Sequence, residues 1–147
     1  MLPLWGTVQR PFRTYNILVV EDNPGDVVLI REAFAESGKA CQLTFATEPR
    51  EAKAALQSQS FDLVISDMGA RNEEGAEFIR FIRSDERLRT LPIIVLSGVP
   101  SSKLAYEAGA NAFIAKSMDM ESFFDKIKAL MHFWVEVVEL PRASNTL

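Results

Sequence analysis

Short aliphatic runs alternate with segments of helical spacing along most of the chain. Residues 16–20 are almost continuously apolar, which is typical of a strand covered on both faces. Turn residues follow this run, and a segment of helical character then ends at Gly38. This order repeats five times, with strands expected over 16–20, 43–45, 61–66, 93–96 and 112–115 and helices over 26–36, 49–56, 76–82, 102–108 and 119–139. Thr47 is expected to cap the second of these helices, and the fourth is expected to end at Gly109. Because parallel strands are joined by right-handed helical crossovers, the pattern predicts an α/β fold in which helices cover both faces of an open parallel sheet.

Composition narrows the class of protein. The chain has 147 residues, of which 48% are hydrophobic, and its formal net charge is −4. We expect one domain over residues 16–140, an N-terminal extension over 1–15 and a C-terminal tail over 141–147. The acidic balance offers little attraction to nucleic acid, and no apolar run approaches the roughly 20 residues that span a bilayer. The single cysteine, Cys41, fits a reducing cytoplasm, so we expect a cytoplasmic protein that binds neither nucleic acid nor membranes.

Polar side chains directly follow four of the five predicted strands. They are Glu21 and Asp22 after the first strand, Asp67 after the third, Ser97 after the fourth and Lys116 after the fifth. Ligands of open parallel sheets bind beyond the carboxyl ends of the strands, so these groups are expected to share one edge. Crowded carboxylates repel one another unless a cation lies among them, and Mg²⁺ prefers oxygen ligands. Taken singly, each residue could be a helix cap, a loop hydroxyl or a solvated charge, but the shared edge favours a metal site.

Four segments resemble the response-regulator receiver domain of two-component signalling. They are 17–26 (ILVVEDNPGD), 62–68 (DLVISDM), 91–98 (LPIIVLSG) and 108–116 (AGANAFIAK). The resemblance covers about residues 16–139. It implies a flavodoxin-like five-stranded sheet in the order 2-1-3-4-5, which the hydrophobic pattern alone does not establish.

The same resemblance assigns roles at the sheet edge. Asp67 would be the aspartate that a histidine kinase phosphorylates. Mg²⁺ would be surrounded by Glu21, Asp22, Asp67 and the backbone carbonyl of Gly69. The protein would then be a phosphoacceptor and not an enzyme, apart from slow self-dephosphorylation.

The resemblance also implies a conformational switch. Lys116 and the Ser97 hydroxyl would hold the phosphoryl oxygens, and Ser97 and Phe113 would form the switch pair. The sequence departs from the family's pattern in three places. Ser117 replaces the usual proline after Lys116, Ala70 replaces another frequent proline, and the chain between the fourth strand and the fifth is about three residues short, nearly one helical turn.

The last predicted helix carries two apolar stripes. The first has the alternating spacing of a coiled-coil seam and consists of Met120, Phe124, Ile127, Met131, Trp134 and Val138. The second consists of Phe123, Leu130, Phe133, Val137 and Leu140. One stripe can cover the sheet and the other needs a different cover, so we expect a homodimer with contacts from Phe124, Ile127, Met131, Phe133, Trp134 and Val138. Alternatively, residues 1–15, with Trp5 and Phe12, cover the second stripe in a monomer.

Three C-terminal features resemble one subgroup of the family, the stand-alone regulators paired with bacterial phytochrome-type histidine kinases. These features are Lys116-Ser117, Phe133-Trp134 and Leu140-Pro141. The resemblance implies a sensor histidine kinase as partner, with a bacterial phytochrome as the candidate. Because six residues follow Pro141, we expect no DNA-binding or enzymatic output domain.

Three rival functions make distinct demands on the sequence. A phosphorylation-independent pseudo-receiver would not need the complete set of polar residues at the strand ends. A Mg²⁺-dependent phosphohydrolase would use Asp67 as nucleophile, but the second acid two positions further on is missing. Flavin binding would need a phosphate-binding loop after the first strand, where Glu21 and Asp22 stand instead.

Overall fold

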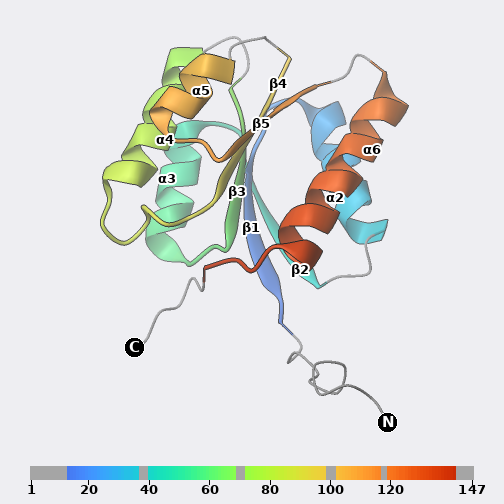
Figure 1. The fold of residues 1–147 in the computed structure, drawn as a ribbon, viewed down its shortest axis with the longest axis horizontal. Helices are drawn as coiled ribbons and strands as arrows, with labels where there is room; N and C mark the ends of the chain where they lie inside the picture. The colour runs from blue at the N-terminus through green and yellow to red at the C-terminus, as the bar shows by residue number, and fades with distance from the viewer. Residues whose placement is uncertain (1–12, 37–39, 69–71, 99–101, 117–118, 142–147) are drawn as a thin grey trace.

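The computed structural model describes residues 13–36, 40–68, 72–98, 102–116 and 119–141. Five parallel strands form one sheet in the order β2-β1-β3-β4-β5 (Figure 1). The strands are β1 (Tyr15–Val20), β2 (Cys41–Ala46), β3 (Leu63–Asp67), β4 (Ile93–Ser97) and β5 (Ala112–Ala115). The helices are α2 (Pro24–Glu36), α3 (Pro49–Ser58), α4 (Asn72–Ser84), α5 (Ser102–Ala108) and α6 (Met120–Met131), with a π-helical turn η1 (His132–Val137) after α6. The predicted fold class and strand order are confirmed.

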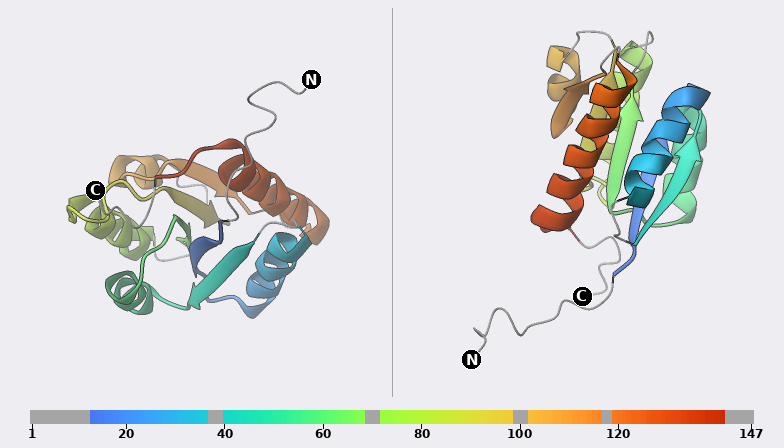
Figure 2. Two further views of the ribbon diagram at one scale, coloured as in Figure 1. Left: turned by 90° about the horizontal axis from the view of Figure 1, so that it is seen from below. Right: turned by 90° about the vertical axis from the view of Figure 1, so that its right-hand side faces the viewer.

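The sheet separates two apolar cores. Helices α3, α4 and α5 cover one face, and α2 and α6 pack side by side on the other (Figures 1 and 2). Successive side chains of a strand point to opposite faces, so Leu18 and Val64 enter the first core while Ile17 and Leu63 enter the second. The three central strands are therefore apolar on both faces, and polar side chains follow where they end.

Two local predictions about helix ends have different outcomes. Thr47 was expected to cap α3, but the N-cap is Glu48, whose side chain makes no capping bond, and the Thr47 hydroxyl hydrogen-bonds to the Glu51 carboxylate. That prediction was wrong by one residue. The predicted end of α5 at Gly109 is confirmed, because this glycine has φ +119° and a Cβ there would lie 2.7 Å from Arg83 Cγ.

The C-terminal helix buries one wide face instead of one of two narrow stripes. Phe123, Ile127, Leu130 and Met131 are buried in the second core, together with Val135 of η1. Their spacing of i, i+4, i+7 and i+8 is that of a helix packed on a globular core. Ile127 and Met131 were therefore wrongly assigned to the dimer interface, because a single domain already buries them.

Other apolar side chains of this segment face solvent. Phe133 is 50% exposed and Val137 is 57% exposed. Phe124, Trp134 and Val138 are half-buried. The rings of Phe133 and Trp134 meet edge to face, with centroids 5.5 Å apart. These residues stay available for the predicted interface.

Several predictions lie outside the described residues. They concern the carbonyl of Gly69, the peptide bond after Lys116, Ala70, and residues 1–12 as a cover for the C-terminal helix. Within the described part of the chain, no helix is both long and apolar enough to cross a membrane.

Candidate functional site

Strand register brings the predicted polar residues to one edge of the sheet. Val20 of β1 is paired with Ser66 of β3, so the next residues, Glu21 and Asp67, are neighbours. Ser97 of β4 is paired with Ala115 of β5, the next strand in the sheet. The backbone N–H of the following residue, Lys116, donates to the Ser97 carbonyl at 2.8 Å. Residues far apart in sequence thus meet where the strands end, as expected.

Three carboxylates converge at this edge. Glu21, Asp22 and Asp67 each offer an oxygen, and these oxygens lie within 4.8 Å of one another. The Glu21 side chain is 1% exposed and that of Asp67 is 10% exposed, whereas Asp22 is open to solvent. Carboxylate oxygens at this spacing fit a hard divalent cation such as Mg²⁺, which keeps several waters besides its protein ligands. The solvent-facing Asp22 side leaves room for those waters.

Lys116 balances part of this negative charge. Its ammonium nitrogen lies 2.9 Å from Glu21 Oε2 and 3.1 Å from Asp67 Oδ2. A third carboxylate, that of Asp26, lies 2.8 Å from the same nitrogen. The first two contacts agree with the site expected from the sequence. Asp26 was not among the predicted site residues, although its place in the first turn after the acidic pair is a signal that could have found it.

The local electrostatics shift two of these groups. Burial raises the pKa of Glu21 to about 7, the charge of Asp67 adds to the rise, and the hydrogen bond and charge of Lys116 oppose it. Burial alone would lower the pKa of Lys116, but its hydrogen bonds to Asp26 and Glu21 outweigh burial and raise it. The ammonium is therefore charged throughout the neutral range, whereas Glu21 exchanges a proton within it.

Ser97 and Phe113 lie on one side of the sheet. Ser97 is 1% exposed, and it stands two residues after Val95, which is paired with Phe113. Val95 belongs to the first core, and the half-buried Phe113 packs against that same core. The backbone N–H of Phe113 donates to the Tyr106 hydroxyl of α5 at 3.1 Å. The residues proposed for the switch therefore occupy adjacent strands on the same face.

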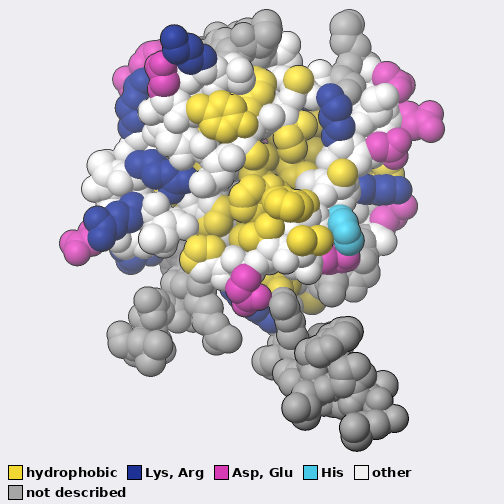
Figure 3. All heavy atoms as spheres, viewed as in Figure 1, with side chains coloured by type: hydrophobic (Ala, Val, Ile, Leu, Met, Phe, Trp, Pro, Cys, Tyr) yellow, Lys and Arg dark blue, Asp and Glu magenta, His cyan; other side chains and the backbone are white. Residues whose placement is uncertain are grey.

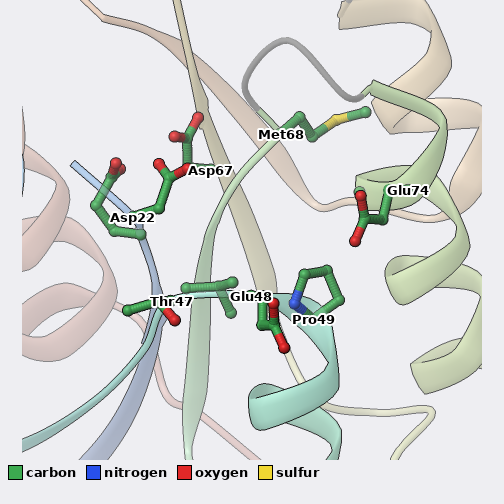
Figure 4. A pocket seen from close by; sticks show the side chains of 10 residues that line it. Asp22, Thr47, Glu48, Pro49, Asp67, Met68 and Glu74 are labelled. Carbon is green, nitrogen blue, oxygen red and sulfur yellow. The ribbon is translucent and has the colours of Figure 1, made fainter.

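A pocket of about 430 Å³ opens beside the carboxylates. Asp22 and Asp67 line one side, and Pro49 and Glu74 line the opposite side (Figure 4). Sequence reasoning did not find the other lining residues, which include Thr47, Glu48, Pro49, Met68, Glu74 and Gly75. Thr47 and Glu48 lie between β2 and α3, and Pro49 begins α3. Met68 follows β3, and Glu74 and Gly75 belong to α4, so the set carries no shared spacing. The glycine at position 75 was the one signal in the sequence. A Cβ there would lie 2.8 Å from Met68 Cγ, so glycine lets α4 approach the residue after β3 this closely.

Comparisons with known proteins agree with this geometry. The family "Response regulator receiver domain" matches residues 17–128. Response regulator Rcp1 of Synechocystis sp. is 27% identical over 137 residues, which cover 86% of this chain and 93% of Rcp1.

Solved structures give the same picture. The phosphorylated cyanobacterial phytochrome response regulator RcpA has a TM-score of 0.81 and 28% identity, covering 88% of this chain and 100% of RcpA. The Mn(2+)-bound form of Rcp1 has a TM-score of 0.80 and 26% identity, covering 87% of this chain and 99% of that one. The response regulator RPA3017, in red light signalling of R. palustris, has a TM-score of 0.74 and 26% identity, covering 87% of this chain and 99% of its own.

Proposed function

This chain belongs to the response regulator receiver domain family, and from that premise we propose that it accepts a phosphoryl group on Asp67 from a sensor histidine kinase. The observation that carries the proposal is the 3.1 Å ion pair between Lys116 and Asp67, which is one of three carboxylates whose oxygens lie within 4.8 Å of one another. Receiver-type response regulators are signalling proteins. We therefore interpret Asp67 as a phosphoacceptor, with slow self-dephosphorylation as its turnover.

Mg²⁺ is the proposed cofactor. Its ligands would be Glu21, Asp22, Asp67 and the carbonyl of Gly69, of which the last lies outside the described residues. The Mn(2+)-bound form of the relative Rcp1 supports a divalent cation in proteins of this kind. When bound, the metal neutralises charge on the oxygens of the transferring phosphoryl group.

The chain's own residues account for the rest of the proposed transfer. The Asp67 carboxylate attacks the phosphorus of a phosphohistidine. A P–O bond forms while the P–N bond breaks, and the leaving imidazole keeps the electron pair. Lys116 donates a hydrogen bond to a phosphoryl oxygen from its place beside Asp67.

The proposed switch follows from the added charge. Phosphorylation of an ester adds about −1.5 to −2 charge, and an acyl phosphate is comparable. The Ser97 hydroxyl would move toward this charge at the end of β4, and Phe113 would turn into the space behind it. Because Phe113 has no hydroxyl, its inward position gains packing but no hydrogen bond. The repacking would change the surface of β5 and its neighbours.

Phosphorylation is tested with acetyl phosphate and Mg²⁺ on the parent protein and on Asp67→Asn, following intact mass and released phosphate. We expect one phosphoryl adduct in the parent and none in the variant. A folded parent that takes up no phosphoryl group would favour the phosphorylation-independent pseudo-receiver. Sustained phosphate release at enzymatic turnover would favour the phosphohydrolase.

A bacterial phytochrome is the proposed sensor kinase. The names of the relatives RcpA, a phytochrome response regulator, and RPA3017, in red light signalling, support this choice. The test is phosphotransfer from an autophosphorylated phytochrome histidine kinase, compared with an unrelated histidine kinase at equal concentration. Faster transfer from the unrelated kinase would reject the pairing. The cytoplasmic location inferred from the sequence stays a prediction.

The apolar surface around β5 and α6 is the proposed homodimer interface. Hydrophobic side chains gather in the middle of this face (Figure 3). Among the described strands, β5 lies at the end of the sheet next to β4 and is therefore an edge strand. Phe133 and Val137 of η1 are about half exposed. A patch of this kind on a folded domain favours a protein partner, and we propose a second copy of the chain. Phe124, Phe133, Trp134 and Val138 remain the proposed contact residues.

Solution mass by light scattering tests the dimer. We expect a dimer for the parent, a monomer for Phe133→Glu, and a dimer for Val28→Glu, in which an exposed apolar side chain of α2 is replaced instead. A monomeric parent would reject the dimer. A dimeric Phe133→Glu variant would reject this interface.

A further inference from the structure

Asp26 contacts the site lysine from a place that the proposed phosphotransfer does not use. Its Oδ2 atom lies 2.8 Å from Lys116 Nζ, and the two side chains are 23% and 15% exposed. Asp26 lies in the first turn of α2, where its backbone N–H donates to Asn23 Oδ1 at 3.1 Å. A negative side chain in a first helical turn is favoured by the helix dipole. The backbone that carries this carboxylate is therefore fixed by its own helix, independently of Lys116.

Asp26 differs from the other two partners of Lys116 in its relation to the metal site. Glu21 and Asp67 belong to the group of carboxylates whose oxygens converge within 4.8 Å, and Asp26 does not. A divalent cation in that group would draw on the Glu21 and Asp67 oxygens and repel the nearby ammonium. The Asp26 carboxylate lies outside that group, so the cation does not compete with Lys116 for it.

From this geometry we infer that Asp26 is a positioning residue, whose carboxylate keeps the Lys116 ammonium directed at the phosphoryl site while Mg²⁺ occupies the acidic cluster. The inference rests on the proposed function. An ammonium has three N–H donors, so one can hold Asp26 while another meets a phosphoryl oxygen. A lysine side chain that is already fixed loses less rotamer freedom when the phosphoryl group arrives.

The test measures binding of beryllofluoride, a phosphoryl mimic, by fluorine NMR at saturating Mg²⁺. Four proteins form a double-mutant cycle: the parent, Asp26→Asn, Lys116→Ala and the double variant. Asp26→Asn is expected to weaken beryllofluoride binding about three- to tenfold, the usual cost of immobilising one long side chain. In the Lys116→Ala background, the same change is expected to alter binding less than twofold. Such non-additivity would not arise from a merely structural role.

Two further measurements separate positioning from general charge. Mg²⁺ affinity without beryllofluoride is expected to change less in Asp26→Asn than beryllofluoride affinity does. Glu32→Gln, which removes an exposed acid from the same helix, is expected to bind beryllofluoride within twofold of the parent.

Three results would overturn the inference. They are an equal loss in both lysine backgrounds, a loss confined to Mg²⁺ affinity, and tighter beryllofluoride binding by Asp26→Asn, which would mean that Asp26 competes for the lysine. A parent protein that binds no beryllofluoride would instead reject the proposed function itself.

Discussion

Magnesium affinity is expected to rise with pH, because the metal must replace a proton on Glu21. Burial first, and then the charge of Asp67, raise the pKa of this carboxyl to about 7 against the opposing effect of Lys116. About one tenth of Glu21 is then ionised at pH 6 and about nine tenths at pH 8 in the metal-free protein. If Mg²⁺ binds only the ionised carboxylate, its apparent dissociation constant falls about tenfold between pH 6 and pH 8.

Titration calorimetry with Mg²⁺ at pH 6, 7 and 8 measures this dependence. Repeating the pH 7 titration in two buffers of different ionisation enthalpy counts the released protons, and we expect about half a proton per metal ion. Glu21→Gln is the control, because it keeps the size of the side chain and removes the titrating group. We expect it to bind Mg²⁺ more weakly and without the tenfold change. Equal affinity of the parent at pH 6 and pH 8, or the same pH dependence in Glu21→Gln, would refute the reasoning.

The remaining predictions concern stability. Because the pKa of Glu21 is raised to about 7, the metal-free folded protein holds a proton that the unfolded chain releases above pH 4.5. The free energy of unfolding should therefore fall by about 3 kcal/mol as pH rises from 4.5 through 7. Urea unfolding measures this fall, which should be smaller in Glu21→Gln. Asp62 is 4% exposed and accepts hydrogen bonds from Arg13 and from the backbone N–H of Asn16. Asp62→Ala should therefore lower the free energy of unfolding by about 2–4 kcal/mol, and a loss below 1 kcal/mol would contradict this account. Ile127→Ala, measured by urea unfolding in the monomeric Phe133→Glu background, should lower the free energy of unfolding by about 2–5 kcal/mol. A loss that appears only in the dimer would show that Ile127 belongs to the dimer interface.

The sheet edge could be predicted because it depends only on where buried strands end. A strand covered on both faces is continuously apolar, so the first polar residues after Val20, Leu96 and Ala115 mark the carboxyl edge directly. The strand order came from the family resemblance, since the alternation of strands and helices allows other orders. The rest of the pocket lining depends on how α3 and α4 pack, which no local spacing encodes.

The misses have physical causes as well. Asp26 contacts Lys116, 90 residues away, and from sequence it looked only like the acidic start of a helix. Ile127 and Met131 were assigned to an outer stripe because the apolar positions of α6 can be divided either into two seams or into one wide face. The π-helical turn changes the periodicity further along, so that Val135 enters the core while Phe133 and Val137 stay exposed.

The most direct test of the central claim is to locate the phosphoryl group. After incubation with acetyl phosphate and Mg²⁺, borohydride reduction converts an aspartyl phosphate to homoserine, which peptide mass spectrometry can assign to one position. The account predicts homoserine at Asp67, dependent on Mg²⁺ and lost when Lys116 is replaced by alanine. Homoserine at another aspartate, or no reduced residue in a protein that binds Mg²⁺, would contradict it.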